Sequence, residues 1–178
     1  MVIFMCGFPF SGKTHILELL KKEYPDTDVI DPKSYRDEEY PKLDEDGKRE
    51  FNISAWQCSL ELLQKTIENT KPDDLIAYDT ACASDQMLDY MDFAKKYKHK
   101  VLVVYVNAKI DLCEKRAGKE WLSQEVVQKY KTNFKNNLLK FRKMADDFVI
   151  IDNNGDQVTL EKAVEKIDAC GIHKSKSS

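Results

Sequence analysis

The stretch that most constrains the fold is a glycine-bounded motif at residues 7–14, Gly-Phe-Pro-Phe-Ser-Gly-Lys-Thr. It fits the pattern G-x-x-x-x-G-K-[ST] at every fixed position. A short apolar run, residues 2–6, precedes the motif and is typical of a buried strand, and the segment after it has apolar residues at helical spacing. Strand, loop and helix in this order are the context that a phosphate-binding loop requires.

The fixed residues of this loop each have a chemical role. The two glycines allow unusual dihedral angles and a close approach to a ligand, and the loop N–H groups form an anion-binding concavity at the positive end of a helix. The lysine places a charge on the β- and γ-phosphates of a nucleotide, and the threonine hydroxyl can hold Mg²⁺. We expect the nucleotide to contact Gly7, Pro9, Ser11, Gly12, Lys13 and Thr14.

Composition limits the class of protein. The chain has 178 residues and a formal net charge of −3, which gives no general electrostatic case for nucleic-acid binding. Its five scattered cysteines form no C-x-x-C pair, so reduced thiols in a cytoplasmic protein are the simplest account. No apolar run approaches the roughly 18 residues of a membrane span. We expect a single domain at residues 1–170 and a disordered tail at 171–178.

Apolar runs and helical patterns alternate along the chain. Strands are expected near 2–6, 28–31, 75–79, 101–106 and 148–152, and helices near 14–24, 51–69, 85–97, 123–144 and 159–169, with a polar loop at 32–50. This alternation predicts an α/β fold of the P-loop kinase type, a five-stranded parallel sheet with helices on both faces. A helix that starts at Ile110 and breaks at Gly118 begins a small helical lid, about residues 116–135.

Acids end three of the predicted strands, at Asp31, Asp79 and Asp152, on the sheet edge where such folds bind ligands. Asp31 is a candidate general base for an attacking hydroxyl, and Asp79 is a candidate to organise Mg²⁺ or the acceptor. An acid that caps a turn is the plain alternative for both. Arg36 is a catalytic candidate that would contact a phosphate, with a surface arginine as its alternative.

Two further groups are candidates for nucleotide binding. Arg116 and Lys119 flank Gly118, where a cation on a closing lid would stabilise charge on the γ-phosphate; the alternative is a pair of helix-end cations. Asn153 and Asn154 follow the last strand and could meet an adenine edge, although a plain turn explains them nearly as well.

In order and spacing the chain resembles the small phosphate-loop kinases of the polynucleotide-kinase and zeta-toxin type, over roughly residues 1–168. The segments that carry the resemblance are Gly7–Thr14, Tyr35-Arg36, Ala55-Trp56 and the residues numbered 75–80, 113–116 and 151–155. The resemblance implies ATP and Mg²⁺ as cofactors and transfer of the γ-phosphate to a hydroxyl. It assigns the phosphate and metal positions to Lys13 and Thr14. It assigns the acceptor-side arginine to Arg36 and the acid after the third strand to Asp79.

The chain departs from that family at two positions. Polynucleotide kinases carry their general-base aspartate three residues before the acceptor-side arginine, where this chain has Lys33, and the nearest upstream acid is Asp31. The lid of that group usually carries a second arginine four residues after the first, where this chain has Glu120 beside Lys119.

The sequence therefore predicts an ATP-dependent kinase whose acceptor is a DNA or RNA 5′-hydroxyl or a nucleotide-like hydroxyl. A small-molecule kinase is the alternative, because the acidic stretch at 37–50 suits a neutral or cationic acceptor better than a polyanion. A nucleotide-binding switch or interaction module is the non-enzymatic alternative. A GTPase would want Asp-x-x-Gly after the third strand, where residues 79–82 read Asp-Thr-Ala-Cys.

Overall fold

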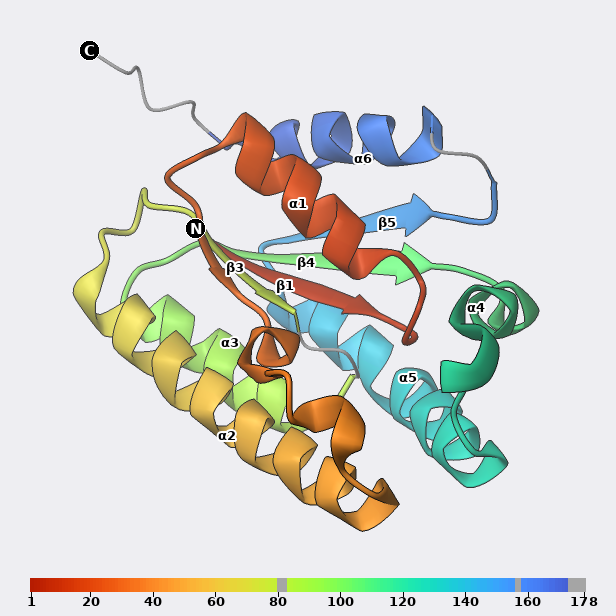
Figure 1. Ribbon diagram of the computed structural model, residues 1–178. Coiled ribbons are helices and arrows are strands. Elements are labelled where there is room, and N and C mark those ends of the chain that lie inside the picture. Colours follow the sequence, from red (N-terminus) through yellow and green to blue (C-terminus); the bar gives the residue numbers. More distant parts are fainter. Residues whose placement is uncertain (80–82, 156–157, 173–178) are drawn as a thin grey trace.

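Five parallel strands form the centre of the computed structural model, which describes residues 1–79, 83–155 and 158–172. The strands are β1 (Val2–Gly7), β2 (Asp28–Ile30), β3 (Ile76–Asp79), β4 (Val101–Asn107) and β5 (Asp147–Asp152). Their order across the sheet is β2-β3-β1-β4-β5, so the strand that leads into the phosphate loop is central (Figure 1). Each carboxyl end therefore lies at the same edge, as the sequence predicts.

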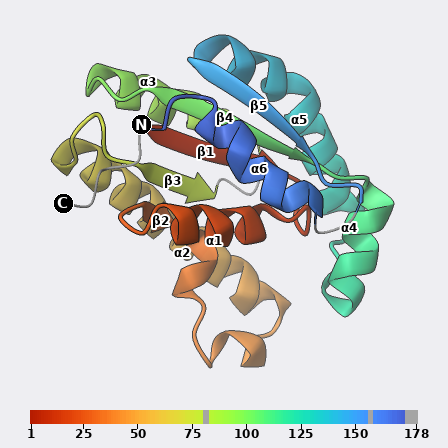
Figure 2. The same ribbon diagram turned by 90° about the horizontal axis from the view of Figure 1, so that it is seen from above.

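Helices cover both faces of this sheet (Figures 1 and 2). One face carries α1 (Lys13–Glu23) and α6 (Val158–Asp168), and the other carries α2 (Glu45–Asn69), α3 (Gln86–Lys96) and α5 (Gln124–Met144). Beyond the carboxyl ends of the strands lie α4 (Ile110–Ala117) and three short 3₁₀ helices, η1 (Pro32–Tyr35), η2 (Tyr40–Lys42) and η3 (Gly118–Glu120). The predicted α/β fold of the P-loop kinase type is confirmed.

The alternation of side chains along β1 builds two cores. Val2, Phe4 and Cys6 join the core beneath α2, α3 and α5. Ile3 and Met5 point the other way and join the core beneath α1 and α6. All five are buried, as expected for a central parallel strand covered on both faces. The loop that follows β1 is therefore attached to a strand that is buried along its whole length.

The start of α2 corrects the sequence prediction. Residues 45–50 were expected in a loop, with the helix beginning near 51, but α2 begins at Glu45. The side chain of Asp44 caps it by accepting the N–H of Gly47 at 2.8 Å. Two acids in the first turn also complement the helix dipole, a local signal that outweighs the poor apolar periodicity of the stretch.

The boundaries around the lid agree with the sequence. Gly118 ends α4 with a positive φ of 55°, and Ser123 caps α5 through its hydroxyl. Most of the tail predicted at 171–178 lies outside the described residues, which end at 172. Within the described ranges, no helix combines the length and apolar character needed to cross a membrane.

Candidate functional site

The glycines that bound residues 7–14 hold the loop in a tight turn. Gly12 has φ 102°, and a Cβ atom there would lie 2.4 Å from Nδ2 of Asn153. A Cβ atom on Gly7 would lie 2.7 Å from Oγ of Ser11. Real Cβ atoms do not approach other atoms so closely, so both positions require glycine for space, and Gly12 also requires it for its backbone conformation.

Lys13 is buried where α1 begins, with an exposed fraction of 3%. Its Nζ donates hydrogen bonds of 3.0 Å to the carbonyl oxygens of Gly7 and Phe8. It also lies 4.0 Å from Oδ1 of Asp79, at the end of β3. A buried cation needs such partners because desolvation otherwise disfavours its charged form. The lysine therefore spans the loop from inside and is held beside the acid of the neighbouring strand.

Asn153 lies against the same loop. Its side-chain amide donates to the carbonyl oxygen of Ser11 at 2.7 Å, and its backbone N–H donates to that of Asn107 at 2.8 Å. Oγ of Ser11 and Oδ1 of Asn153 are buried without a hydrogen-bond partner among the described residues. Asn153 thus ties the loop to the ends of β4 and β5, a role that the sequence analysis did not identify. Its predicted contact with adenine stays a prediction.

The side chain of Asn154 also makes hydrogen bonds to residues near the strand ends. Its Oδ1 accepts the backbone N–H of Lys109 at 2.7 Å, and its amide donates to the carboxylate of Asp152. These bonds fix the turn after β5, the plain alternative that the sequence left open. The predicted contact of Asn154 with adenine likewise stays a prediction.

Arg116 reaches the loop from the last turn of α4. Its Nη1 lies 3.4 Å from the carbonyl oxygen of Ser11, and its Nη2 donates to that of Asn153 at 3.2 Å. The structure therefore brings this predicted lid cation to the phosphate loop. Lys119 lies in η3, is exposed and makes no hydrogen bond or ion pair with a described residue.

Asp31 faces the same edge from the end of β2. Its carboxylate caps η1 by accepting the backbone N–H of Lys33 at 2.9 Å. Burial raises the pKa of Asp31, and the negative charge of Asp79 adds to this, while the bond from Lys33 and the charges of Lys33 and Lys13 oppose it. A carboxylate with a raised pKa is a better proton acceptor, which suits the predicted role of general base.

Arg36 points to a different neighbourhood. Its Nη2 donates to Oδ1 of Asn52 at 3.0 Å, and its guanidinium carbon lies 4.4 Å from the centre of the Tyr40 ring. The arginine is exposed and does not line the cavity beside the phosphate loop. Its predicted contact with a phosphate is therefore not visible here and stays a prediction.

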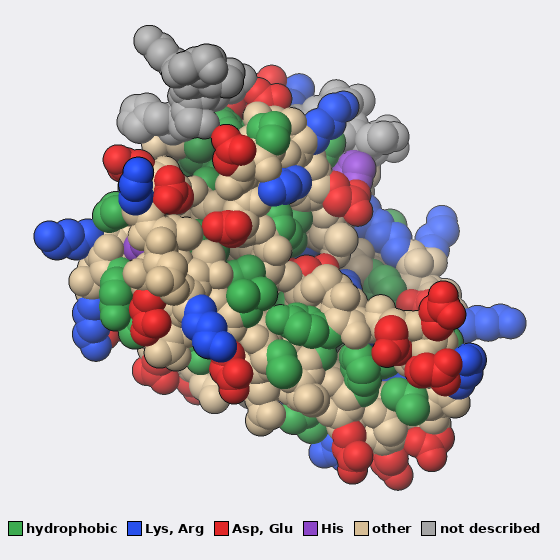
Figure 3. Space-filling view, turned by 60° about the vertical axis from the view of Figure 1, so that its left-hand side comes forward, with side chains coloured by type: hydrophobic (Ala, Val, Ile, Leu, Met, Phe, Trp, Pro, Cys, Tyr) green, Lys and Arg blue, Asp and Glu red, His purple; other side chains and the backbone are tan. Residues whose placement is uncertain are grey.

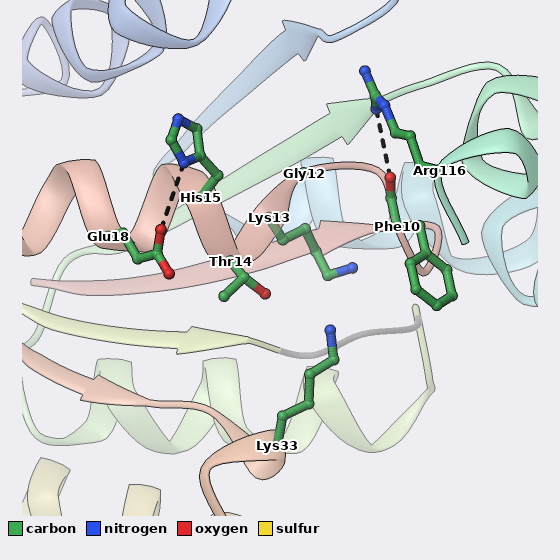
Figure 4. A pocket seen from close by; sticks show the side chains of 8 residues that line it. All are labelled: Phe10, Gly12, Lys13, Thr14, His15, Glu18, Lys33 and Arg116. Atoms are coloured by element: carbon green, nitrogen blue, oxygen red, sulfur yellow. Dashed lines mark hydrogen bonds and ion pairs between the residues drawn. The ribbon is translucent and has the colours of Figure 1, made fainter. Parts of the chain in front are cut away.

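A cavity of about 340 Å³ opens beside the loop (Figure 4). It is lined by Phe10, Gly12, Lys13, Thr14, His15, Glu18, Lys33 and Arg116. Cations from three separate elements thus meet at one cavity, and among the described residues Glu18 is the only carboxylate in its lining, 3.5 Å from His15. Such convergence favours an anionic ligand. The sequence singled out Lys33 as a departure from a family pattern, not as a binding residue.

The residues present fit a nucleotide with Mg²⁺. The hydroxyl of Thr14 lines the cavity and makes no hydrogen bond with a described residue. Asp79 lies beside Lys13, the residue that precedes Thr14. In the described part of the chain no three His, Cys, Asp or Glu side chains form a metal cluster. Mg²⁺ usually takes one or two carboxylates and completes its shell with water and substrate phosphates.

Fold and loop together define the class: this is a P-loop kinase fold. Comparison of the sequence with protein families gives a match to the family described as AAA domain (AAA_33) over residues 2–136, and the chain belongs to that family. No curated protein sequence matches the chain significantly.

Solved structures of similar fold share little sequence with the chain. One, from work on the PezAT chromosomal toxin–antitoxin system of Streptococcus pneumoniae, has a TM-score of 0.63 at 13% identity, covering 95% of this chain and 86% of its own. A sugar kinase from Janibacter sp. HTCC2649 has a TM-score of 0.59 at 10% identity, covering 96% and 95%. Shikimate kinase from Aquifex aeolicus has a TM-score of 0.57 at 14% identity, covering 97% and 99%. At such identities the likeness shows the fold alone.

Proposed function

We propose that the protein is an ATP-dependent kinase that transfers the γ-phosphate of ATP to a hydroxyl group. The observation that carries the proposal is the meeting of Lys13, Lys33 and Arg116 at one cavity beside a complete phosphate loop. Cations held on three separate elements match a triphosphate, whose negative charge is spread along the chain of phosphates. The P-loop kinase fold supports this function over that of a switch protein.

Each of these side chains has a separate role in phosphate transfer. Lys13 and the loop N–H groups bind the phosphates, and Thr14 and Asp79 would hold the metal. Bound Mg²⁺ neutralises charge on the phosphates. Asp31 accepts the proton of the attacking hydroxyl, whose oxygen bonds to the γ-phosphorus while the bond to the bridging oxygen of ADP breaks. Arg116 lies near the loop and would stabilise negative charge on the γ-phosphate.

A small hydroxyl compound is the acceptor that the surface favours. Acidic side chains gather at the lower right of the molecule in Figure 3. The stretch 37–50, which follows η1 on the acceptor side, contains seven acids against three basic residues. That charge repels a polyanion. The names of two similar structures, a sugar kinase and a shikimate kinase, agree with a small acceptor.

A polynucleotide 5′-hydroxyl remains the acceptor that the sequence resemblance predicts. The acceptor-side arginine of that family corresponds to Arg36, which here binds Asn52 and stacks on Tyr40. A polynucleotide would have to draw Arg36 away from both partners. This observation makes the polynucleotide the second candidate and the small acceptor the first.

Transfer of labelled phosphate from ATP tests the proposal directly. Sugars, small alcohols, nucleosides and 5′-hydroxyl oligonucleotides serve as acceptors, with the Lys13→Ala protein as the inactive control. Transfer to a small neutral alcohol should change little as salt rises, whereas transfer to an oligonucleotide should weaken steeply. If no acceptor in the panel is labelled and the protein binds no ATP, the kinase proposal is wrong.

A further inference from the structure

We propose that Lys33 is the residue that recognises the γ-phosphate of the bound nucleotide. The inference rests on the proposed function and adds a residue to it. Lys33 lines the cavity beside the phosphate loop, together with Lys13 and Arg116. Its amino group donates hydrogen bonds, which suits contact with the oxygens of a phosphate.

The backbone of η1 holds Lys33 in a defined place. Its N–H donates to the carboxylate of Asp31 at 2.9 Å, and its carbonyl oxygen accepts the N–H of Arg36 at 3.0 Å. Pro32 at the start of η1 further restricts the turn. The side chain leaves this turn toward the phosphate loop, with its amino group directed at the region of Lys13 and Thr14 (Figure 4).

The three cations of the cavity differ in what they already bind. Lys13 donates to two loop carbonyl oxygens, and Arg116 contacts the carbonyl oxygens of Ser11 and Asn153. Lys33 is exposed, and its amino group makes no hydrogen bond or ion pair with any described residue. It is thus the cation whose hydrogen-bonding capacity is left for a ligand.

The strand order indicates which phosphate Lys33 meets. Lys33 follows β2, at one edge of the sheet, whereas Asn153 and Asn154 follow β5, at the opposite edge, with the phosphate loop between them after β1. If the base contacts Asn153 and Asn154, as the sequence predicts, and the phosphates lie in the loop, the last phosphate points toward β2. Lys33 and Lys13 then approach the transferred group from two sides, which stabilises the charge on its oxygens during transfer.

Calorimetric titration with two nucleotides tests this assignment, because AMP-PNP carries a γ-phosphate and ADP lacks one. In the presence of Mg²⁺, Lys33→Ala should weaken AMP-PNP about tenfold and change ADP by less than about twofold, as expected for one partly exposed charge-assisted contact. Lys33→Arg keeps the charge and should recover most of the affinity. Lys22→Ala, which removes an exposed lysine from the far end of α1, is the matched control and should change neither nucleotide.

Two outcomes overturn the assignment while leaving the kinase proposal intact. In one, Lys33→Ala weakens both nucleotides equally, which places the lysine away from the last phosphate. In the other, it changes neither, which leaves Lys33 to the acceptor or to solvent. If the unaltered protein binds neither nucleotide, the proposed function itself fails. Thermal unfolding of each variant separates a loss of contact from a loss of fold.

Discussion

Charged side chains are arranged differently at the two edges of the central sheet. At the amino ends of β4 and β5, Lys95 lies 3.0 Å from Asp146 and Lys100 lies 2.6 Å from Asp147. At the carboxyl ends, Lys13, Lys33 and Arg116 line a cavity to which the described residues contribute a single carboxylate, Glu18. The amino edge pairs Lys95 and Lys100 with surface acids. At the carboxyl edge Lys13 lies 4.0 Å from Asp79, whereas Lys33 and Arg116 make no ion pair with a described residue.

This contrast separates charges that serve the fold from charges that serve a ligand. Ion pairs at a surface contribute a little stability, and their charges are already compensated without a ligand. Like charges that lie close together repel each other and lower stability. Proteins tolerate such clusters mainly at functional sites. The carboxyl edge also holds two buried polar atoms, Oγ of Ser11 and Oδ1 of Asn153, without a partner among the described residues.

The largest expected effect is from Lys13→Ala, which removes the central cation of the carboxyl edge. We expect phosphate transfer to fall at least about a thousandfold, because the variant loses stabilisation of charge in both the ground state and the transition state. Labelled-phosphate transfer and calorimetry with AMP-PNP measure the loss. Lys95→Ala, a lysine from the amino edge, is the matched control. Equal activity of Lys13→Ala and the parent protein would refute a role in phosphate transfer for the cations at this edge.

Asp31→Asn should have the next largest effect on transfer, a fall of about a hundredfold or more. The amide keeps the shape and the acceptor for the N–H of Lys33 but cannot take a proton. Transfer by the parent protein should also fall at acid pH, as Asp31 becomes protonated at its raised pKa. A pH profile of transfer measures both effects. An unchanged acid limb in the variant would assign the base to another residue.

The same variant should be slightly more stable than the parent protein at pH 7. Burial, helped by Asp79, raises the pKa of Asp31 above its ordinary value of 3.8. The folded protein therefore binds this proton more tightly than the unfolded chain, and stability falls as the pH rises from about 3.8 through the raised value. Urea unfolding at pH 3 and pH 7 checks the sign, since the stability gain from Asp31→Asn should appear only at the higher pH.

Gly12→Ala should damage the loop itself. The new Cβ would meet Nδ2 of Asn153 at 2.4 Å, in a backbone conformation with φ 102°. We expect a loss of about 1–3 kcal/mol in the free energy of unfolding, together with weaker nucleotide binding. Gly118→Ala is the matched control, because its φ of 55° is also positive but a Cβ there would meet no atom within 4 Å. Equal costs for the two variants would mean that the contact with Asn153 adds nothing.

Most of the fold could be predicted because its signals are local. The apolar run of residues 2–6, the glycines of the loop and the caps at Ser123 and Gly118 each specify a boundary, and the structure confirms them. The start of α2 was not predicted because its first turn is polar and lacks apolar periodicity. The N-cap and the interaction of first-turn acids with the helix dipole determine where this helix begins. Burial follows the apolar pattern less closely, since Leu139, an apolar residue of α5, has an exposed fraction of 61%.

The site was predictable only in part, for a physical reason. The loop and the acids at strand ends follow from topology, since parallel strands bring their carboxyl ends to one edge. Side-chain direction does not follow from topology. Arg36 turns toward Asn52 and Tyr40, and Lys33 turns toward the phosphate loop, although they lie three residues apart. Spacing alone could not tell which cation lines the cavity.

The smallest effect is expected at the amino edge, from Asp146→Asn. Burial raises the pKa of Asp146, but the N–H of Val101 at 2.8 Å and the amino group of Lys95 outweigh it and leave the pKa below 3.8. The side chain is 39% exposed, so we expect a loss of about 1 kcal/mol or less at pH 7 and no change in nucleotide affinity.

The pH dependence of this loss makes it a test of the comparison between the two edges. A lowered pKa stabilises the fold above the unfolded value of 3.8, and that stability disappears as the pH falls below it, the opposite sign to Asp31. The difference between parent and variant in urea unfolding should therefore shrink at low pH, and also at high salt. A change in AMP-PNP affinity would show that charged residues at the amino edge also affect nucleotide binding. The proposed difference between the two edges would then be wrong.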